Sequence, residues 1–356
     1  MHPKQFQQCV LSWYQRHGRH DLPWQHNPTA YRVWVSEIML QQTQVNTVIP
    51  FYRAFMKRFP NIKLLATAEL DEVLTHWSGL GYYARARNLH KTAKYIYEQY
   101  YGRFPKTLTD IMALPGIGRS TAGAIGSFAM KQPTPILDGN VKRVLARFCG
   151  IMEWPGQKNV HDALWKVAEH FTPQQNTAAY NQAMMDLGSI ICKRSQPRCI
   201  QCPLQNHCQA CRQQLIEKIP AKKPQLKSRP KKAIQMLLIQ RLNPHAIFLE
   251  KRPALGIWGG LWSFPECSTD ENVVDWCKSH LKIQAVVQTR WPLLYHQFSH
   301  FELAIHPVLL QFKKFNSVMM ESIDQVWHIK ENKNPGGIAA PVAKLLSRVF
   351  TTEELV

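Results

Sequence analysis

Long apolar runs are missing from this 356-residue sequence. No uninterrupted apolar stretch approaches the roughly 20 residues that span a bilayer as a helix. The N-terminal stretch MHPKQFQQCVLSWYQRH also lacks the apolar core of a secretory signal peptide. These absences argue against a membrane or secreted protein and favour a cytoplasmic one. In that reducing compartment the nine cysteines are expected to be reduced or metal-bound rather than paired as disulfides.

Acidic residues are scarce as well. The sequence has 24 Asp and Glu against 44 Lys and Arg, a formal net charge of +20. A basic field of this size favours a polyanionic partner, because each neutralised phosphate releases condensed counterions. A ribosome-associated protein, or a merely basic one, would show the same balance. Charge therefore indicates a class of partner and not a function.

The length and patterning of the chain predict two domains. Residues 1–217 are expected to form a mainly helical domain, with helices over 6–16, 33–45, 70–77 and 84–100. Residues 218–232, KIPAKKPQLKSRPKK, have the composition of a solvated linker. Residues 233–356 are expected to form an α+β domain. Its predicted elements are a hairpin around Asn243-Pro244, strands over 303–312 and 325–328, and helices over 272–280 and 341–348.

Four cysteines form a C-x6-C-x2-C-x5-C array at Cys192, Cys199, Cys202 and Cys208. Four thiolates packed this closely can close one tetrahedral metal site or hold one cubane cluster. Structural zinc usually shows two short C-x2-C pairs, and here only one pair is that close. The uneven spacing favours a [4Fe–4S] cluster in a loop over residues 192–208. The alternative is incidental clustering of buried cysteines.

A G-x-G turn joins two helical patterns at Gly116 and Gly118, within LPGIGRSTAGAI. Glycine lets a backbone pass close to an oxygen ligand, and the start of the next helix offers unpaired N–H groups. On a basic chain this pattern is typical of a helix–hairpin–helix that binds a DNA backbone without reading its sequence. Taken alone it would also fit a plain tight turn.

Two carboxylates stand out. Asp138 lies directly before a predicted helix, in ILDGNVKRVL, where taken alone it would most simply be an N-cap. Glu37 lies in an almost unbroken apolar stretch, VWVSEIML. If that stretch is buried, desolvation raises the pKa of Glu37 and keeps it protonated near neutral pH, as a general acid requires. The alternative is that Glu37 lies on the solvent-exposed face of the helix.

The hairpin, the segment around Asp138 and the cysteine array together resemble the helix–hairpin–helix superfamily of DNA glycosylases. WVSEIMLQQTQV, GLGYYARARNL and NQAMMDLG narrow the resemblance to the MutY family of adenine DNA glycosylases, over essentially the whole chain. The resemblance implies that a base is flipped out of double-stranded DNA. Glu37 then protonates adenine, and Asp138 stabilises the positive charge on the sugar. Asn140 orients Asp138 or water, Gln182 contacts the adenine, and Trp24 and Leu40 shape the base pocket.

The same resemblance assigns contacts with the DNA. Gln42, Leu80 and Tyr82 match residues that wedge into the duplex, Thr43 lies beside them, and Lys142 is expected to contact phosphate. Superfamily members that also cleave the strand, such as endonuclease III, carry a lysine where this chain has Ser120. A hydroxyl cannot form the Schiff base that drives elimination. We therefore expect a monofunctional glycosylase.

The C-terminal segment GIWGGLWSFPE resembles the start of a Nudix-like fold, yet the residues after it lack the R-E-x-x-E-E set that holds magnesium. The domain is therefore expected to recognise and not to hydrolyse. Phe298, Ser299 and His300 match the loop that, in the MutY family, probes 8-oxoguanine opposite the target adenine. Without that resemblance, F-S-H is an ordinary strand end.

The leading hypothesis is a monomeric, nucleoid-associated enzyme that excises adenine mispaired with 8-oxoguanine or guanine and so initiates base excision repair. A bifunctional pyrimidine-lesion glycosylase and lyase is disfavoured by Ser120 and by the C-terminal domain. A non-catalytic iron–sulfur DNA-binding protein would not need both Glu37 and Asp138. A nucleoside-diphosphate hydrolase would need the missing metal-binding carboxylates.

Overall fold

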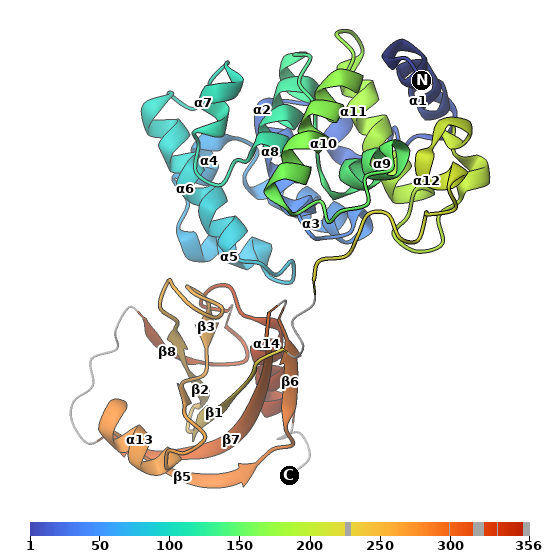
Figure 1. Ribbon diagram of the computed structural model, residues 1–356. Helices are drawn as coiled ribbons and strands as arrows, with labels where there is room; N and C mark the ends of the chain where they lie inside the picture. The colour runs from blue at the N-terminus through green and yellow to red at the C-terminus, as the bar shows by residue number, and fades with distance from the viewer. Residues whose placement is uncertain (225–228, 299, 316–323, 333, 352–356) are drawn as a thin grey trace. The chain divides into compact units, whose positions relative to one another are not determined.

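The computed structural model describes residues 1–224, 229–298, 300–315, 324–332 and 334–351 (Figure 1). The chain divides into two compact units, each described here by itself. The first comprises Met1–Thr67 and Asn88–Pro224, and the second Ala68–Arg87 and Gln225–Val356. None of the helices in these described ranges is long and apolar enough to cross a membrane.

Helices dominate the chain up to residue 212. In chain order they are α1 (Pro3–His17), η1 (Pro23–Gln25), α2 (Ala30–Leu40), α3 (Val45–Arg58), α4 (Ile62–Ala66), α5 (Leu70–Trp77), α6 (Ala84–Gln99), α7 (Leu108–Met112), α8 (Arg119–Ala124), η2 (Ile125–Ala129), α9 (Gly139–Cys149), α10 (Lys158–Phe171), α11 (Thr177–Asp186), η3 (Leu187–Ile191), η4 (Cys199–Gln201), η5 (Gln205–His207) and α12 (Gln209–Arg212). The helices predicted over 6–16, 70–77 and 84–100 are confirmed as α1, α5 and α6.

The single helix predicted over 33–45 is wrong in its extent. Thr29 caps the start of α2 by accepting a hydrogen bond from the Arg32 amide (3.2 Å). The helix ends at Leu40, and Gln42 takes a left-handed conformation with φ of 58°, which an α-helix cannot include. A new helix, α3, begins at Val45. The break leaves the polar segment 41–44 between two helices.

The core of the first unit lies among α1, α9, α10 and α11. Phe6 of α1 packs on Phe148 of α9 and on Phe171 of α10, with ring centroids 4.8 and 4.4 Å apart. All three side chains are buried, and burying an aromatic side chain of this size contributes about 2–3 kcal/mol. Ile219, inside the stretch predicted to be a linker, is buried in the same core. This core holds α9 and α11, two of the helices that carry the site described below.

The second unit is built on a mixed sheet. Its elements are β1 (Lys231–Leu242), β2 (His245–Lys251), β3 (Trp262–Ser263), β4 (Glu266–Cys267), α13 (Val273–His280), β5 (Ile283–Arg290), β6 (Leu294–Gln297), β7 (Glu302–Phe315), β8 (Gln325–His328) and α14 (Ala340–Thr351). The strand order is β3-β2-β1-β7-β5, with β4 on β1, β6 on β7 and β8 on β2.

The predicted hairpin is confirmed: β1 and β2 pair antiparallel across the Asn243-Pro244 turn. β1 also pairs in parallel with β7, with Lys231 opposite Glu302 and Gln240 opposite Gln311. The other two predicted strands correspond to β7 and β8, and the two predicted helices to α13 and α14. In Figure 1, α13 lies along β5, and its buried Cys277 belongs to the same core as Ile283 of that strand. The unit is an α+β domain, as predicted.

Candidate active site

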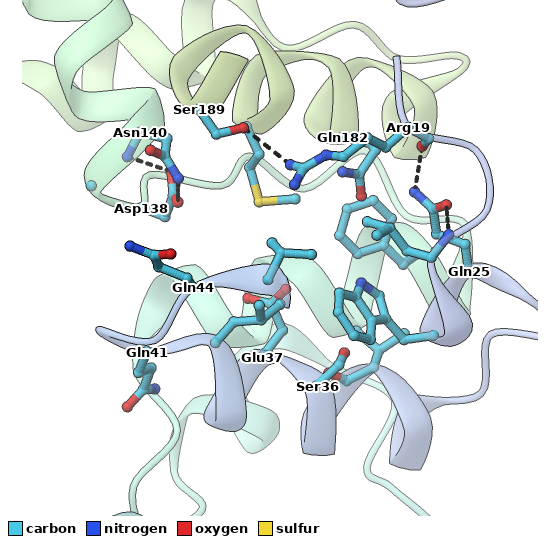
Figure 2. A pocket seen from close by; sticks show the side chains of 18 of the residues that line it. Arg19, Gln25, Ser36, Glu37, Gln41, Gln44, Asp138, Asn140, Gln182 and Ser189 are labelled. Atoms are coloured by element: carbon cyan, nitrogen blue, oxygen red, sulfur yellow. Dashed lines mark hydrogen bonds between the residues drawn. The ribbon is translucent and has the colours of Figure 1, made fainter. Parts of the chain in front are cut away.

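A cavity of about 1480 Å³ opens in the first unit (Figure 2). It is larger than the roughly 300–1,000 Å³ of a typical small-molecule site. Its walls come from the segment after α1, from α2 and residues 41–46, from α8, from the start of α9, and from α11 and η3. Of the residues predicted to act, it is lined by Trp24, Glu37, Leu40, Gln42, Thr43, Ser120, Asp138, Asn140 and Gln182.

Glu37 reaches the cavity from α2, whose other side is packed into the protein. Its helix neighbours Val35, Ile38 and Met39 are buried. Burial of the carboxyl group, with a smaller contribution from the charge of Asp138, raises the pKa of Glu37 to about 8. Glu37 therefore keeps its proton at neutral pH. Of the two alternatives that the sequence left open, this is the one required of a general acid.

Asp138 is held at the start of α9. One of its oxygens accepts hydrogen bonds from the amides of Asn140 (3.0 Å) and Val141 (2.7 Å), so the predicted N-cap is present. The other accepts from the Asn140 side chain at 3.0 Å (Figure 2). Burial raises the pKa of Asp138, while these hydrogen bonds and the nearby Arg143 oppose the increase. The donors stabilise the ionised form and fix its orientation.

The two carboxyl groups differ in chemistry although they share one cavity. The Glu37 carboxyl group is buried and near the charge of Asp138, whereas the Asp138 carboxylate accepts three hydrogen bonds. Environments that separate the properties of two carboxyl groups are how an acid and an anion are assigned in glycoside hydrolysis. Figure 2 shows them on different sides of the cavity, with Asp138 beside Asn140 and Glu37 on α2. The cavity can therefore offer a proton at one point and a negative charge at another.

The Ser120 hydroxyl is tied to the chain just before Asp138. Its Oγ accepts a hydrogen bond from the Leu137 amide at 3.2 Å. Position 120 therefore lies close to Asp138, and both residues line the cavity. A lysine at this position would place its amine in the same cavity. The hydroxyl that is present offers no amine for Schiff-base chemistry.

Several predicted DNA-contact residues do not line the cavity. Gly116 and Gly118 form the turn between α7 and α8, and Gly116 has a φ of 76°, which favours glycine. A side-chain carbon at Gly116 would also meet Asn88 at 3.1 Å. Lys142 lies on α9, where burial lowers its pKa and Asp138 opposes the decrease.

The remaining predicted DNA contacts belong to the second unit. Tyr82 is 49% exposed with a φ of 47°, whereas Leu80 is buried in this structure. Phe298 stacks on Phe301 with ring centroids 4.4 Å apart, and His300 packs edge-on against the same ring. Ser299 lies outside the described residues.

None of the four cysteines of the array forms a disulfide, and all four are partly buried. Burial, with smaller contributions from the Cys192, Cys208 and Cys199 thiols, raises the pKa of Cys202 to about 12, so the four lie near one another. Arg147 donates to Cys192 Sγ (3.4 Å), and its carbonyl accepts from Cys208 Sγ (3.3 Å). Within the described residues no three His, Cys, Asp or Glu side chains are already arranged as a metal site. The donor set, four neighbouring cysteines, fits a thiolate-bound cluster.

Sequence reasoning missed two residues of the cavity region, Arg19 and Asp186. Arg19 lines the cavity and forms an ion pair with Asp186, which is completely buried. A carboxylate in the otherwise apolar AMMDLG segment was the available signal for Asp186, the same signal that drew attention to Glu37. Arg19 and Asp186 lie 167 residues apart, and no pattern in the sequence near either residue indicates that they pair.

Both units of the chain match known protein families. Residues 35–170 match the HhH-GPD superfamily of base excision DNA repair proteins, and residues 235–348 match the NUDIX domain. An adenine DNA glycosylase of Buchnera aphidicola (Acyrthosiphon pisum) is 42% identical over 96% of both chains. The adenine DNA glycosylase of Homo sapiens is 43% identical over 58% of this chain and 39% of its own.

Among solved structures, a thermostable thymine-DNA glycosylase covers 59% of this chain and 97% of its own, with a TM-score of 0.55 and 27% identity. An endonuclease III structure, at 21% identity, covers 60% of this chain and 99% of its own with a TM-score of 0.51 and shares the fold. The predicted fold classes of both domains, helix–hairpin–helix glycosylase and Nudix-like, are confirmed. On the strength of a relationship that extends over nearly its whole length, the chain belongs to the adenine DNA glycosylases, a family of base excision repair enzymes.

Proposed function

We propose that the protein hydrolyses the N-glycosidic bond of adenine opposite 8-oxoguanine or guanine in duplex DNA and leaves the strand uncut. The observation that carries the proposal is that Glu37 and Asp138 line one cavity, where one keeps its proton and the other is held by donors. The Buchnera and human relatives described above are both adenine DNA glycosylases, which supports adenine as the base.

In the proposed reaction the adenine nucleotide is flipped into the cavity, because the bond is inaccessible within the base stack. Glu37 gives its proton to the adenine ring, which makes adenine a better leaving group. As the C–N bond breaks, the Asp138 carboxylate stabilises the positive charge on the sugar, and water adds to the sugar carbon. Asn140 holds Asp138 in place and is itself held by Arg143, which donates to Asn140 Oδ1 at 2.9 Å.

The base would be held by Trp24, Leu40 and Gln182, all of which line the cavity. Gln42 and Thr43 lie at its edge in the polar segment after α2 and would contact the duplex. Leu80 and Tyr82 would insert beside the flipped nucleotide, which requires Leu80 to leave its buried position. The main-chain amides around Gly116 and Gly118, together with Lys142, would bind phosphates.

The Nudix-like domain would recognise the base opposite adenine. The Phe298-Ser299-His300 segment supports this through its match to the family, and Phe298 and His300 are held by ring contacts with Phe301. A DNA substrate implies that the enzyme acts where the chromosome lies, in the cytoplasm at the nucleoid, and we propose that it acts there as a monomer.

Cys192, Cys199, Cys202 and Cys208 would hold a [4Fe–4S] cluster. When bound, the cluster would supply iron–thiolate bonds that tie four points of the 192–208 loop together. Arg147 already anchors this loop, since it donates to the Lys193 carbonyl (2.6 Å) and to Cys192 Sγ (3.4 Å). The loop carries Lys193, which lines the cavity. A rigid loop would fix the position of this lysine for contact with DNA.

The test uses the full-length protein and duplexes with adenine opposite 8-oxoguanine. Products are resolved with and without hot alkali. Strand breaks that appear only after alkali support the proposal, whereas breaks without alkali contradict monofunctional chemistry. Duplexes with cytosine opposite 8-oxoguanine serve as the control, and excision of that cytosine would contradict the specificity. Glu37→Gln, which keeps the shape but carries no acidic proton, is expected to bind the mispair and release no adenine.

A further inference from the structure

Asp186 is a completely buried carboxylate at the end of α11 that touches the cavity only through other residues. Oδ2 accepts a hydrogen bond from the Arg19 amide at 2.7 Å. Oδ1 accepts from Arg19 Nε at 2.9 Å and Nη2 at 2.5 Å, and from Gln182 Nε2 at 2.8 Å. Four donors therefore converge on this carboxylate, three from Arg19 and one from Gln182, and both of its oxygens are held.

This arrangement decides which way round the Gln182 amide lies. An ionised carboxylate can only accept hydrogen bonds, so Gln182 must present its nitrogen to Asp186. Its oxygen is then left for the cavity, and Figure 2 shows the Gln182 amide oxygen turned into the cavity. A reversed amide would set an oxygen against the Asp186 carboxylate and leave a buried charge without one of its donors. Gln182 thus acts as a fixed acceptor.

We propose that Asp186, held by Arg19, is a positioning residue that makes Gln182 a hydrogen-bond acceptor and so selects a base carrying an exocyclic amino group. The inference rests on the proposed function, because it requires the adenine to occupy this cavity. An amino group donates to the Gln182 oxygen. A 6-oxo purine would place its own carbonyl oxygen, an acceptor, against the Gln182 oxygen. An unsubstituted purine would leave the Gln182 oxygen without a donor. Sites built around a hydrogen bond discriminate in this way because the missing partner strands a buried polar group.

The discriminating measurement is a ratio of two rates in the same protein. Single-turnover release of adenine is compared with release of unsubstituted purine, each opposite 8-oxoguanine. Wild type is expected to favour adenine. In Asp186→Ala the amide of Gln182 is free to turn, so the adenine-to-purine ratio is expected to fall about 5- to 150-fold. Unsubstituted purine has no amino group to donate to Gln182. The variant is therefore expected to release adenine more slowly and to release purine at nearly the wild-type rate.

A double-mutant cycle separates positioning from simple structural support. If Asp186 acts through Gln182, then Gln182→Ala lowers the ratio to a similar value, and the double variant lowers it no further. Asp186→Asn, which keeps the side-chain shape, provides a milder change in case the alanine variant does not fold. Glu266→Gln is the matched control. It breaks an Arg–carboxylate pair of the second unit, with Arg252 at 2.6 Å, and is expected to leave the ratio unchanged.

Parallel loss of both rates in the Asp186 variants, with the ratio unchanged, would overturn the inference and leave Asp186 a structural residue. Additive effects on the ratio in the double variant would overturn it too. Failure of the wild-type protein to release adenine at all would instead contradict the proposed function, and the inference with it.

Discussion

Glu37 retains a proton that an exposed glutamate has lost at neutral pH. Because its pKa is raised to about 8, the protonated form that serves as the acid is present below that value and is lost as pH rises through it. We expect the single-turnover rate of adenine release to decline above about pH 8, tenfold per pH unit. Rates are measured on a fixed duplex over pH 6–10. A rate that keeps rising through this range would rule out Glu37 as the acid.

The same shift has a cost in stability. Between the ordinary value of 4.5 and about 8, unfolding releases the Glu37 proton, so this residue destabilises the fold increasingly as pH rises. Glu37→Gln is therefore expected to raise the free energy of unfolding at pH 8 by about 2–4 kcal/mol and to have little effect at pH 4. Urea denaturation at the two pH values measures this. An equal effect at both would mean that proton release is not the cause.

At position 120, one substitution can replace the hydroxyl group of Ser120 with an amine. Ser120→Lys is expected to produce strand breaks without alkali and a covalent adduct with DNA under borohydride, because an amine can form the Schiff base that a hydroxyl cannot. Loss of the hydrogen bond from Leu137 should cost about 1 kcal/mol. Ser120→Ala is the control, with the hydroxyl removed and no amine added. Absence of the adduct would show that position 120 is not aligned with the sugar.

Individual residues were predictable where the signal was local. Glu37 and Asp138 could be found because one interrupts an apolar stretch and the other precedes a helix. Arg19 and Asp186 could not be paired, because their contact depends on how α11 packs beside the segment after α1. The roles assigned to the DNA-contact residues rested on family resemblance and remain predictions.

At the scale of elements, α9 begins at a residue with two functions. Asp138 caps the helix and also faces the cavity. Asn caps helices about as well as Asp, whereas Ala does not. Asp138→Asn is therefore expected to keep the cap and, because burial raises the pKa of Asp138, not to lower the free energy of unfolding at neutral pH. Asp138→Ala loses the cap and is expected to be about 1 kcal/mol less stable than Asp138→Asn.

Both variants are expected to lose adenine release, since neither carries an anion. Stability from urea denaturation and single-turnover rates are compared in the two proteins. If Asp138→Asn kept its rate, the residue would be a cap alone.

Element types were easier to predict than element ends. The helices α5 and α6 followed from apolar residues at intervals of three and four, and the hairpin of β1 and β2 from two short apolar runs on either side of Asn243-Pro244. The break between α2 and α3 did not, because apolar spacing continues through a turn that Gln42 forms in the left-handed region. β5 was missed although Ile283 and Ala285 alternate with exposed residues, since its second half is largely exposed. Its pairing with β7 determines its structure.

At the scale of the whole molecule, the charge of +20 governs binding to DNA of any sequence. We expect affinity for an undamaged duplex to fall by about 10³-fold or more between 50 and 200 mM salt, because several phosphate contacts release counterions. Lys142→Ala should reduce the slope of log K against log salt by about one. Lys278→Ala, an exposed lysine on α13, is the control with no expected change. Equal slopes for all three proteins would exclude Lys142 as a phosphate contact.

The ion pair between Arg19 and Asp186 also bears on the order in which the enzyme becomes competent. Arg19 is synthesised before its partner, which follows 167 positions later in the chain. Until α11 has been synthesised, the amide of Gln182 has no fixed direction and the wall of the cavity is incomplete. In the proposed site, an unfinished chain therefore lacks a complete base pocket, and the proposed selectivity for a base arises only when the two distant segments dock.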